Sequence, residues 1–490
     1  MNTVGKVYII GAGPGDEELV TLKALRKMKE CTAVLYDRLV GQGILKYLKD
    51  DCKIYYCGKE PGCHYKTQDE INSMIVELAK EGHTVGRIKG GDPYIFGRGG
   101  EEALALLKEN IEFEVISGVT SPVAALNYAG IPVTHRKVAR SFHVFTAKTA
   151  DDSNINFKAA ASINGTLIFL MGYRQLDSIT KKLMENGMNS KTPCAVVMRG
   201  TTSAQKKVVG NLDNIKTKCD SENIGSPCII VVGDVINFNE KLDWYEKEPL
   251  FGRNICITRS KQQSKEIREK LIELGAEVTE INSIEIKDTS QNLSAYVERL
   301  KGYDYIFLTS VNAVEIFFNY LALNDYDVRK IKAKFVVIGE GTKNALKRHG
   351  IIAEITAKKS NGEGLFLAIK DYVNKDDKIF IPRSKNSRQY VKTQLLEMGC
   401  SVDECFIYET VTGKILDKKV FDRVDTVIFT SPSTVRNMIT LVGEDKIRSK
   451  RVISIGPITG KELDKIKAQY SVCSKCNTDG MIKECLNYEK

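Results

Sequence analysis

The second half of the chain contains an internal repeat, and that repeat strongly restricts the folds that the chain can adopt. Three blocks occur twice in the same order: "ICITRSKQQSKEIREKLIELGAEV" matches "IFIPRSKNSRQYVKTQLLEMGCSV", "IFLTSVNAVEIF" matches "VIFTSPSTVRNM", and "VVIGEGTKNAL" matches "ISIGPITGKEL". The repeat is far longer than a solenoid unit, so it indicates a duplicated domain. In each block an apolar strand ends in small polar residues and a helix follows, which predicts two related α/β lobes facing one cleft.

The repeat also pairs polar residues that would lie at the carboxyl ends of strands, where open α/β sheets bind ligands. The pairs are Arg259 with Arg383, Ser310 with Ser431, and Thr342 with Thr459. Helix N-termini at that edge present free N–H groups to anions, so two such lobes suit a ligand with many carboxylates. Each hydroxyl could instead serve only as a helix N-cap.

The first half, to about residue 245, alternates short apolar strands with helical patterns, which is typical of the α/β class. We predict strands at 6–10, 32–36, 53–57, 84–89, 112–116, 142–146, 166–171, 193–198 and 227–232, and helices at 17–30, 68–81, 100–109, 119–129 and 174–187. The stretch "WYEKEPLFG" combines charge, proline and glycine, as a linker does. We therefore expect domains at 1–245 and 253–490, a linker at 246–252, and C-terminal lobes at about 253–286 plus 412–490 and at 287–411.

The stretch "VYIIGAGPGDEELV" at 7–20 has the strand, glycine turn and helix of a dinucleotide-binding loop. However, Asp16 occupies the position of the third glycine, and Pro14 removes a backbone donor from the turn. Glu17 and Glu18 add negative charge where a pyrophosphate would bind. A nicotinamide oxidoreductase remains an alternative, but the loop favours a ligand without a pyrophosphate.

The stretch "RIKGGDPYIFGRGGEEALALL" at 87–107 is a second glycine-rich turn. Gly90 and Gly91 leave the backbone uncovered after a strand, and Asp92 supplies an acceptor. The stretch has no Gly-Lys-Ser/Thr, so it is not a P-loop. An acceptor-rich loop of this kind favours an adenosine or an amino-acid ammonium over a phosphate.

Three stretches resemble the uroporphyrinogen-III C-methyltransferases of the tetrapyrrole methylase family. They are "GAGPGD" to "VLYDRLV" over 11–40, "RIKGGDPYIFGRGGEEA", and "FEVISGVTSPVAALNYAGIPVTHR". The resemblance covers nearly all of residues 4–245. It implies a two-lobed methylase fold, S-adenosyl-L-methionine as methyl donor with S-adenosyl-L-homocysteine as product, no metal, and a homodimer formed through this domain.

The same resemblance implies roles for particular residues. The methyl donor would contact Pro14, Gly90, Gly91, Asp92, Ile95, Thr120, Ser121, Met171 and Gly200. Asp37 in "LYDRLV" matches the family's proposed proton acceptor, and Lys59 in "CGKE" matches its proposed proton donor. Apart from the resemblance, Arg136 at the end of "PVTHR" has a guanidinium that could bind a substrate carboxylate, or it could belong to a surface pair. The stretches at 116–121 and 145–149 depart from the family pattern.

The second half resembles the uroporphyrinogen-III synthases in "FTSPSTVRNM", in "IGPITGKEL" and in its duplication. This resemblance implies closure of hydroxymethylbilane to uroporphyrinogen III with inversion of ring D, mainly by holding the flexible substrate in place. Tyr408 in "IYET" matches a tyrosine that would assist the leaving hydroxyl, and Thr342 and Thr459 match threonines that face the cleft. Arg259 and Arg383 could hold carboxylates.

Together the two resemblances predict a bifunctional enzyme that makes uroporphyrinogen III and methylates it twice to precorrin-2, for sirohaem or cobalamin. Two alternatives stay open: a methylase of a later corrinoid, and a C-terminal half that binds a tetrapyrrole without catalysis.

The bulk composition limits partners and compartment. The net charge of +10 suits a polyacidic substrate, and no basic block resembles a nucleic-acid arm. We expect no membrane span and a cytoplasmic protein, because apolar runs are short and the 13 cysteines are scattered. Cys473 and Cys476 form a single C-x-x-C pair, which is a weak metal signal.

Overall fold

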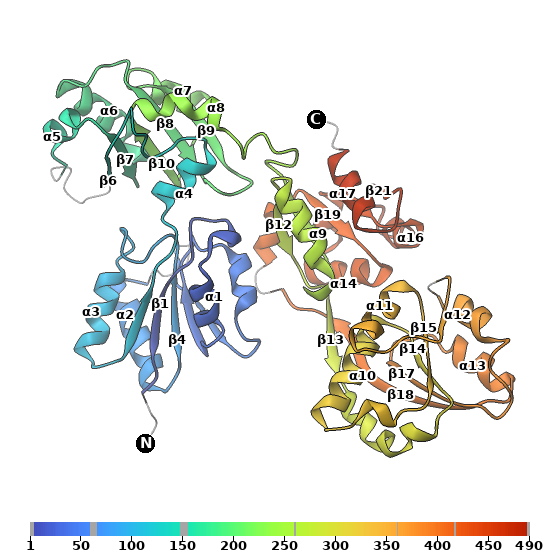
Figure 1. Cartoon of the computed structure of the whole chain (residues 1–490). Helices are drawn as coiled ribbons and strands as arrows, with labels where there is room; N and C mark the ends of the chain where they lie inside the picture. Colours follow the sequence, from blue (N-terminus) through green and yellow to red (C-terminus); the bar gives the residue numbers. More distant parts are fainter. Residues whose placement is uncertain are drawn as a thin grey trace.

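The computed structural model describes residues 4–58, 66–147, 155–258, 261–359, 361–415 and 418–487. This part of the chain forms four α/β units, each built on a sheet of its own (Figure 1). Two buried apolar clusters flank each sheet, so every unit has its own core. Within these ranges no helix is long and apolar enough to cross a bilayer.

The first sheet is parallel throughout and has the order β3-β2-β4-β1-β5. Its strands are β1 (Val7–Gly11), β2 (Ala33–Tyr36), β3 (Lys53–Tyr56), β4 (Val85–Lys89) and β5 (Phe113–Ile116). Its helices are α1 (Leu22–Met28), α2 (Gln68–Lys80) and α3 (Gly99–Lys108), with the 3-10 helices η1 (Glu17–Leu19) and η2 (Gln42–Tyr47). Because parallel strands end at one edge, the loops after β1, β2 and β4 lie together there.

The helix α4 (Ser121–Tyr128) leads to the second sheet, which is mixed and has the order β6-β7-β10-β8-β9. Its strands are β6 (Phe142–Thr146), β7 (Thr166–Leu170), β8 (Pro193–Met198), β9 (Lys206–Asn211) and β10 (Cys228–Val232). Its helices are α5 (Phe157–Ser162), α6 (Leu176–Glu185), α7 (Ile215–Ser221) and α8 (Asn239–Leu242), with η3 (Tyr173–Gln175) and η4 (Asp234–Phe238). Figure 1 shows α4 between the first two units.

The third and fourth sheets share one topology, as expected from the sequence repeat. The third has the order β12-β11-β19-β20-β21, and the fourth has the order β13-β18-β17-β14-β15-β16, so five strands correspond in sequence order. The third unit contains β11 (Asn254–Ile257), β12 (Glu277–Glu280), β19 (Thr426–Phe429), β20 (Arg451–Ser454) and β21 (Tyr470–Val472), with α9 (Lys261–Glu273), η8 (Lys418–Arg423), α14 (Pro432–Val442), α15 (Glu444–Arg448), α16 (Pro457–Asp464) and α17 (Thr478–Leu486).

The fourth unit adds one antiparallel strand, β13, at the edge of an otherwise parallel sheet. It contains β13 (Ile284–Asp288), β14 (Tyr305–Leu308), β15 (Lys334–Val337), β16 (Ile355–Thr356), β17 (Lys378–Ser384) and β18 (Ser401–Thr412), with α10 (Val311–Leu323), α11 (Glu340–Arg348), α12 (Gly362–Ile369), α13 (Tyr390–Glu397), η5 (Ser290–Ala295), η6 (Val297–Gly302) and η7 (Val328–Lys330).

The chain passes between the third and fourth units twice, at 281–283 and at 413–415. The two passages touch, since the backbone N–H of Gly413 donates to the carbonyl of Ser283 at 3.1 Å. A Cβ atom on Gly413 would lie 1.8 Å from the carbonyl oxygen of Asn282, so only glycine fits this close approach. The two units are therefore joined by a narrow double crossing.

The elements predicted for the first half agree with the structure in type and position. All nine predicted strands are present, and the largest difference at an end is one residue. The sequence analysis missed β9, α5, α7 and α8, and it joined η1 to α1 as a single helix. The prediction of an α/β fold and of a duplicated second half is confirmed.

Candidate active sites

One large cleft lies between the first two sheets and extends along the third unit. Its volume is about 2410 Å³. All nine residues predicted to contact the methyl donor line it, namely Pro14, Gly90, Gly91, Asp92, Ile95, Thr120, Ser121, Met171 and Gly200. The predicted proton acceptor Asp37 lines the same cleft.

Glycines in and behind the wall of this cleft bring three loops into backbone contact. The N–H of Gly91 donates to the carbonyl of Gly13 at 2.7 Å, which joins the loop after β4 to the loop after β1. A Cβ atom on Gly118 would lie 2.2 Å from the Gly91 carbonyl oxygen and 2.8 Å from Gly11 Cα. Asp92 reinforces the junction, since its Oδ2 accepts from the Gly118 N–H at 3.1 Å. The glycines thus make a tight backbone wall that a side chain would disrupt.

Asp16, which departs from the dinucleotide fingerprint, connects the two N-terminal units. Its Oδ1 accepts from the Glu18 N–H at 2.8 Å and caps η1, while its Oδ2 accepts from the hydroxyl of Tyr128 at 2.7 Å. Its own N–H donates to Thr201 Oγ1. Burial and the Asp16 carboxylate raise the pKa of Tyr128, so the phenol stays a donor. The acidic residue therefore holds the glycine loop against α4 and the second unit.

Asp37 follows β2 and belongs to a largely buried ion cluster. The Nη2 atom of Arg87 lies 2.7 Å from both Asp37 carboxylate oxygens. Arg87 Nε donates to Glu102 Oε1 at 2.8 Å, and Lys89 Nζ donates to the same oxygen at 2.9 Å. Arg87 and Lys89 share one face of β4 because side chains alternate along a strand. Sequence analysis missed this cluster, although two cations in a buried strand were a visible signal.

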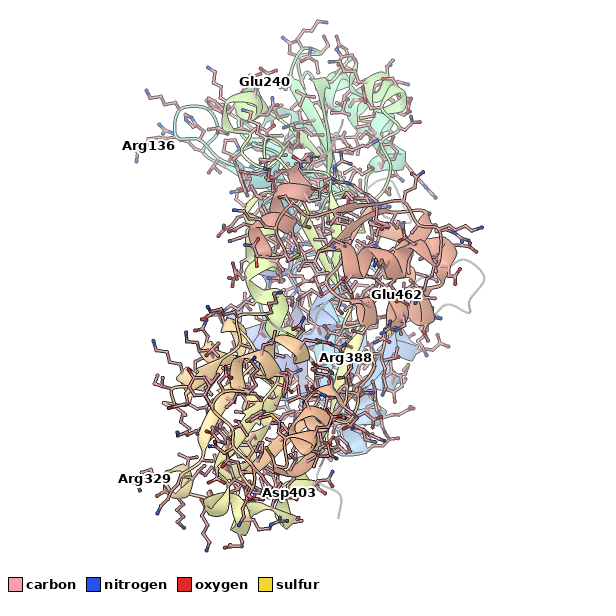
Figure 2. All side chains as sticks on the ribbon, turned by 90° about the vertical axis from the view of Figure 1, so that its right-hand side faces the viewer. Arg136, Glu240, Arg329, Arg388, Asp403 and Glu462 are labelled. Carbon is pink, nitrogen blue, oxygen red and sulfur yellow. The ribbon has the colours of Figure 1, made fainter. Side chains whose placement is uncertain are left out.

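For three predicted site residues the structure gives no support for a place in the cleft. Lys59 and Arg259 lie outside the described residues. Arg136 is exposed and does not line the cleft; Figure 2 shows it projecting outward at the edge of the second unit.

In the fourth unit the predicted Tyr408 and Ser310 meet. The Tyr408 hydroxyl lies 2.8 Å from Ser310 Oγ, and Tyr408 is buried on β18. Burial raises the pKa of Tyr408, although hydrogen bonds with Ser310 and Ser384 work in the opposite direction. Ser310 also caps α10, because its Oγ accepts from the Ala313 N–H at 3.0 Å. The phenol is therefore protonated and lies next to a helix N-terminus.

The other repeated residues that the structure describes are caps, buried helix residues or members of ion pairs. Ser431 caps α14 and forms a capping box with Thr434. Thr342 and Thr459 are buried in the first turns of α11 and α16. Arg383 is buried and forms an ion pair with Glu404 at 2.9 Å. These contacts match the N-cap interpretation of the serines and leave Arg383 already paired with a carboxylate.

A second ion cluster connects the first unit to the third. Lys46 Nζ lies 2.7 Å from Glu17 Oε2 and 2.5 Å from Glu280 Oε2. Arg268 on α9 lies 3.2 Å from Glu17 and 3.6 Å from Glu280. Glu17, which the sequence analysis treated only as repulsion toward a phosphate, thus holds the two halves together.

Two families match the chain, one in each half. The tetrapyrrole (corrin/porphyrin) methylases match residues 6–216, and uroporphyrinogen-III synthase HemD matches residues 265–483. A porphyrin biosynthesis protein HemD from Ruminiclostridium josui is 37% identical over 98% of this chain and 98% of its own. The chain is a tetrapyrrole methylase fused to a uroporphyrinogen-III synthase. The cleft of the first two units therefore belongs to the methylase half, and Tyr408 belongs to the synthase half.

Two further relatives cover the methylase half alone. An S-adenosyl-L-methionine-dependent uroporphyrinogen III methyltransferase from Methanosarcina barkeri is 44% identical over 49% of this chain and 94% of its own. A crystal structure of uroporphyrin III C-methyl transferase from Thermus thermophilus is 36% identical, covers 48% of this chain and 99% of its own, and has a TM-score of 0.41.

The described residues hold no group of three or more His, Cys, Asp or Glu side chains that could bind a metal ion. Cys473 is buried and Cys476 is exposed, and both are free thiols.

Proposed function

We propose that the synthase half closes hydroxymethylbilane to uroporphyrinogen III with inversion of ring D, and that the methylase half adds two methyl groups to give precorrin-2. The protein is a bifunctional enzyme of tetrapyrrole biosynthesis, with S-adenosyl-L-methionine as methyl donor and S-adenosyl-L-homocysteine as product. We further propose that residues 1–245 and 253–490 are its two domains, joined by 246–252.

One observation carries the methylase assignment: nine residues from distant loops line a single cleft together with Asp37. The lining fits an adenosylated amino acid, because it offers glycine backbone and acceptors rather than a phosphate-binding Gly-Lys-Ser/Thr. The bound donor would supply an electrophilic methyl group. The chain's residues then have to orient the porphyrinogen and accept a proton.

Asp37 is the proposed proton acceptor. The methylated macrocycle carries a positive charge until it loses a C–H proton, and a positioned carboxylate can accept it. Arg87 fixes the Asp37 side chain by contacting both of its oxygens at 2.7 Å. Lys59 remains the proposed proton donor, and Arg136 the proposed contact for a substrate carboxylate.

Tyr408 and the repeated polar residues are the proposed synthase site. Tyr408 can donate to the leaving hydroxyl of hydroxymethylbilane, since its phenol is protonated and its oxygen already lies beside Ser310. The N-termini of the helices that Ser310 and Ser431 cap, and of the helices that hold Thr342 and Thr459 in their first turns, offer N–H groups to substrate carboxylates. Arg259 and Arg383 are the proposed cationic contacts at the ends of the equivalent strands.

The test is a coupled reaction of the whole chain with hydroxymethylbilane and S-adenosyl-L-methionine. We expect uroporphyrinogen III in excess of the spontaneous isomer I, followed by a product with two added methyl groups in mass analysis. Isomer I alone would refute the synthase assignment, and an unmethylated isomer III would refute the methylase assignment.

We also propose a homodimer formed through the methylase half and a cytoplasmic location. Exposed apolar side chains outside the cleft lining, Tyr94 in the loop before α3 and Leu104 and Leu107 on α3, support a second copy as partner. Light scattering on the purified chain tests this, and a monomer would refute it. The twelve cysteines that the structure describes are free thiols, which supports a reducing compartment.

A further inference from the structure

The ion cluster around Asp37 contains a lysine that the proposed mechanism does not use. Lys89 is the last residue of β4 and is buried, yet it lines the cleft beside Asp37. Its Nζ lies 3.8 Å from Asp37 Oδ2. Among the described residues Glu102 Oε1 is the one acceptor within hydrogen-bond distance of Nζ, so two N–H positions of the ammonium remain without a partner.

The ion pair between Arg87 and Asp37 needs an ionised Asp37 carboxylate. Arg87 is 2% exposed, and its Nη2 is neutralised on the cleft side by the Asp37 carboxylate. Protonation of Asp37 would remove the negative charge that faces Arg87 Nη2, while Arg87 Nε keeps its bond to Glu102 Oε1. A neighbouring amine that removes the proton restores the Arg87–Asp37 ion pair.

Lys89 has the surroundings of such an amine. Burial, followed by the positive charge of Arg87, lowers the pKa of Lys89 from 10.5, so the neutral form is more accessible than for a solvated lysine. Once protonated, Lys89 lies between the carboxylates of Glu102 and Asp37, which stabilise the ammonium.

We propose that Lys89 is a second proton-transfer group of the methylase site, and that in its neutral form it takes from Asp37 the proton that the methylated porphyrinogen loses. This inference rests on the proposed function. The pyrrole carbon bonds to the methyl carbon while the carbon–sulfur bond breaks, and its electron pair stays on sulfur. The cationic macrocycle gives a C–H proton to the Asp37 carboxylate, and the C–H electron pair forms a ring double bond. The proton then moves from the Asp37 O–H to the lone pair of Lys89 Nζ, once the two groups have closed from 3.8 Å to hydrogen-bond distance.

The other titratable groups near this relay come from four elements. Asp37 follows β2, Arg87 lies on β4, and Glu102 and Glu101 lie on α3, where Lys89 and Glu101 interact electrostatically. Cys57 follows β3, and burial raises the pKa of its thiol, so it remains protonated. Lysine must be neutral to accept a proton. The methylation rate should therefore rise with pH and level off above the pKa of Lys89.

The test is single-turnover methylation of uroporphyrinogen III by the whole chain across neutral and alkaline pH. Lys89→Arg keeps the positive charge but cannot become neutral, because guanidinium stays protonated in proteins. We expect it to lower the rate by roughly 100-fold or more and to abolish the alkaline rise, with S-adenosylhomocysteine affinity unchanged. Lys207→Arg is the matched control, because the Lys207 side chain is only 9% exposed and is also ion-paired but does not line the cleft.

A Lys89→Arg variant that kept both the wild-type rate and the alkaline rise would overturn the proposal. If Lys89→Arg does not fold, the pH profile of the wild-type rate is measured at several temperatures instead. The apparent pKa of the rate shifts strongly with temperature when an amine titrates, and hardly at all when a carboxyl group titrates. A temperature-independent pKa would also overturn the proposal. A wild-type chain that transferred no methyl group at all would refute the proposed function instead.

Discussion

The ion cluster between the two halves makes a quantitative prediction about their association. We consider a double-mutant cycle that combines Lys46→Met with Glu280→Gln. Lys46 Nζ and Glu280 Oε2 are 2.5 Å apart, and the side chains are 19% and 10% exposed. Two unit charges about 4 Å apart interact by about 4 kcal/mol at an effective dielectric constant of about 20.

The measured coupling will be smaller than this Coulomb energy. Glu17 remains beside Lys46 at 2.7 Å in the Glu280→Gln variant, and dehydration of both groups opposes the attraction. We therefore expect a coupling free energy of about 1–3 kcal/mol, within the range for contacting charged residues. Either single variant should destabilise the association of the halves by nearly as much as the double variant does.

The assay is urea unfolding followed by the fluorescence of the single tryptophan, Trp244. This residue lies next to the expected linker and contacts Tyr128 and Tyr245, so its signal reports on the junction of the halves. The matched control is the pair Lys216 and Asp220, which has the same separation of 2.5 Å but is 41% and 56% exposed. That pair should couple by about 0.5 kcal/mol or less. A Lys46–Glu280 coupling no larger than the control would refute the role of this cluster.

Three further predictions concern the two sites and their pH dependence. Gly118→Ala should abolish the binding of S-adenosylhomocysteine measured by calorimetry, because the new Cβ atom would lie 2.2 Å from the Gly91 carbonyl oxygen. Gly100→Ala is the control and should bind normally, because its Cβ atom would meet nothing within 4 Å. Tyr408→Phe should slow formation of isomer III several-fold without abolishing it, since holding the substrate supplies most of the catalysis; an unchanged rate would remove Tyr408 from the site. Burial alone would raise the pKa of Glu280, but Lys46 and Arg268 hold that pKa below 4.5. The ionised Glu280 carboxylate therefore stabilises the folded chain above pH 4.5, and this stabilisation is lost as pH falls through the lower folded pKa. The Lys46–Glu280 coupling should accordingly vanish in unfolding experiments at acid pH.

The secondary structure of the first half was predictable because its strands are short, apolar and bounded by glycine or polar turns. The one strand of this half that the sequence analysis missed is β9. It lies at a sheet edge and has the sequence "KKVVGN", where two lysines and a glycine weaken the strand pattern. The helices α5, α7 and α8 have at most seven residues, which is too short for a clear helical period.

The candidate methyl-donor contacts were predictable for a different reason. Close backbone approach requires glycine, so Gly90 and Gly91 were visible in the sequence before any fold was known. The ion-pair partner of Asp37, by contrast, could not be identified from the sequence. Arg87 is 50 residues away, and its approach depends on the order in which β2 and β4 pair.

The sequence by itself therefore determined the α/β class, the duplication of the second half and the glycine loops of the cleft, because each is a local pattern of polarity or of backbone freedom. Only the tertiary structure decided which charges neutralise one another. Lys46 and Glu280 are 234 residues apart, and Asp16 meets Tyr128 across 112 residues. Such pairs form because packing brings two surfaces together and removes water from them, and no spacing along the chain encodes that contact.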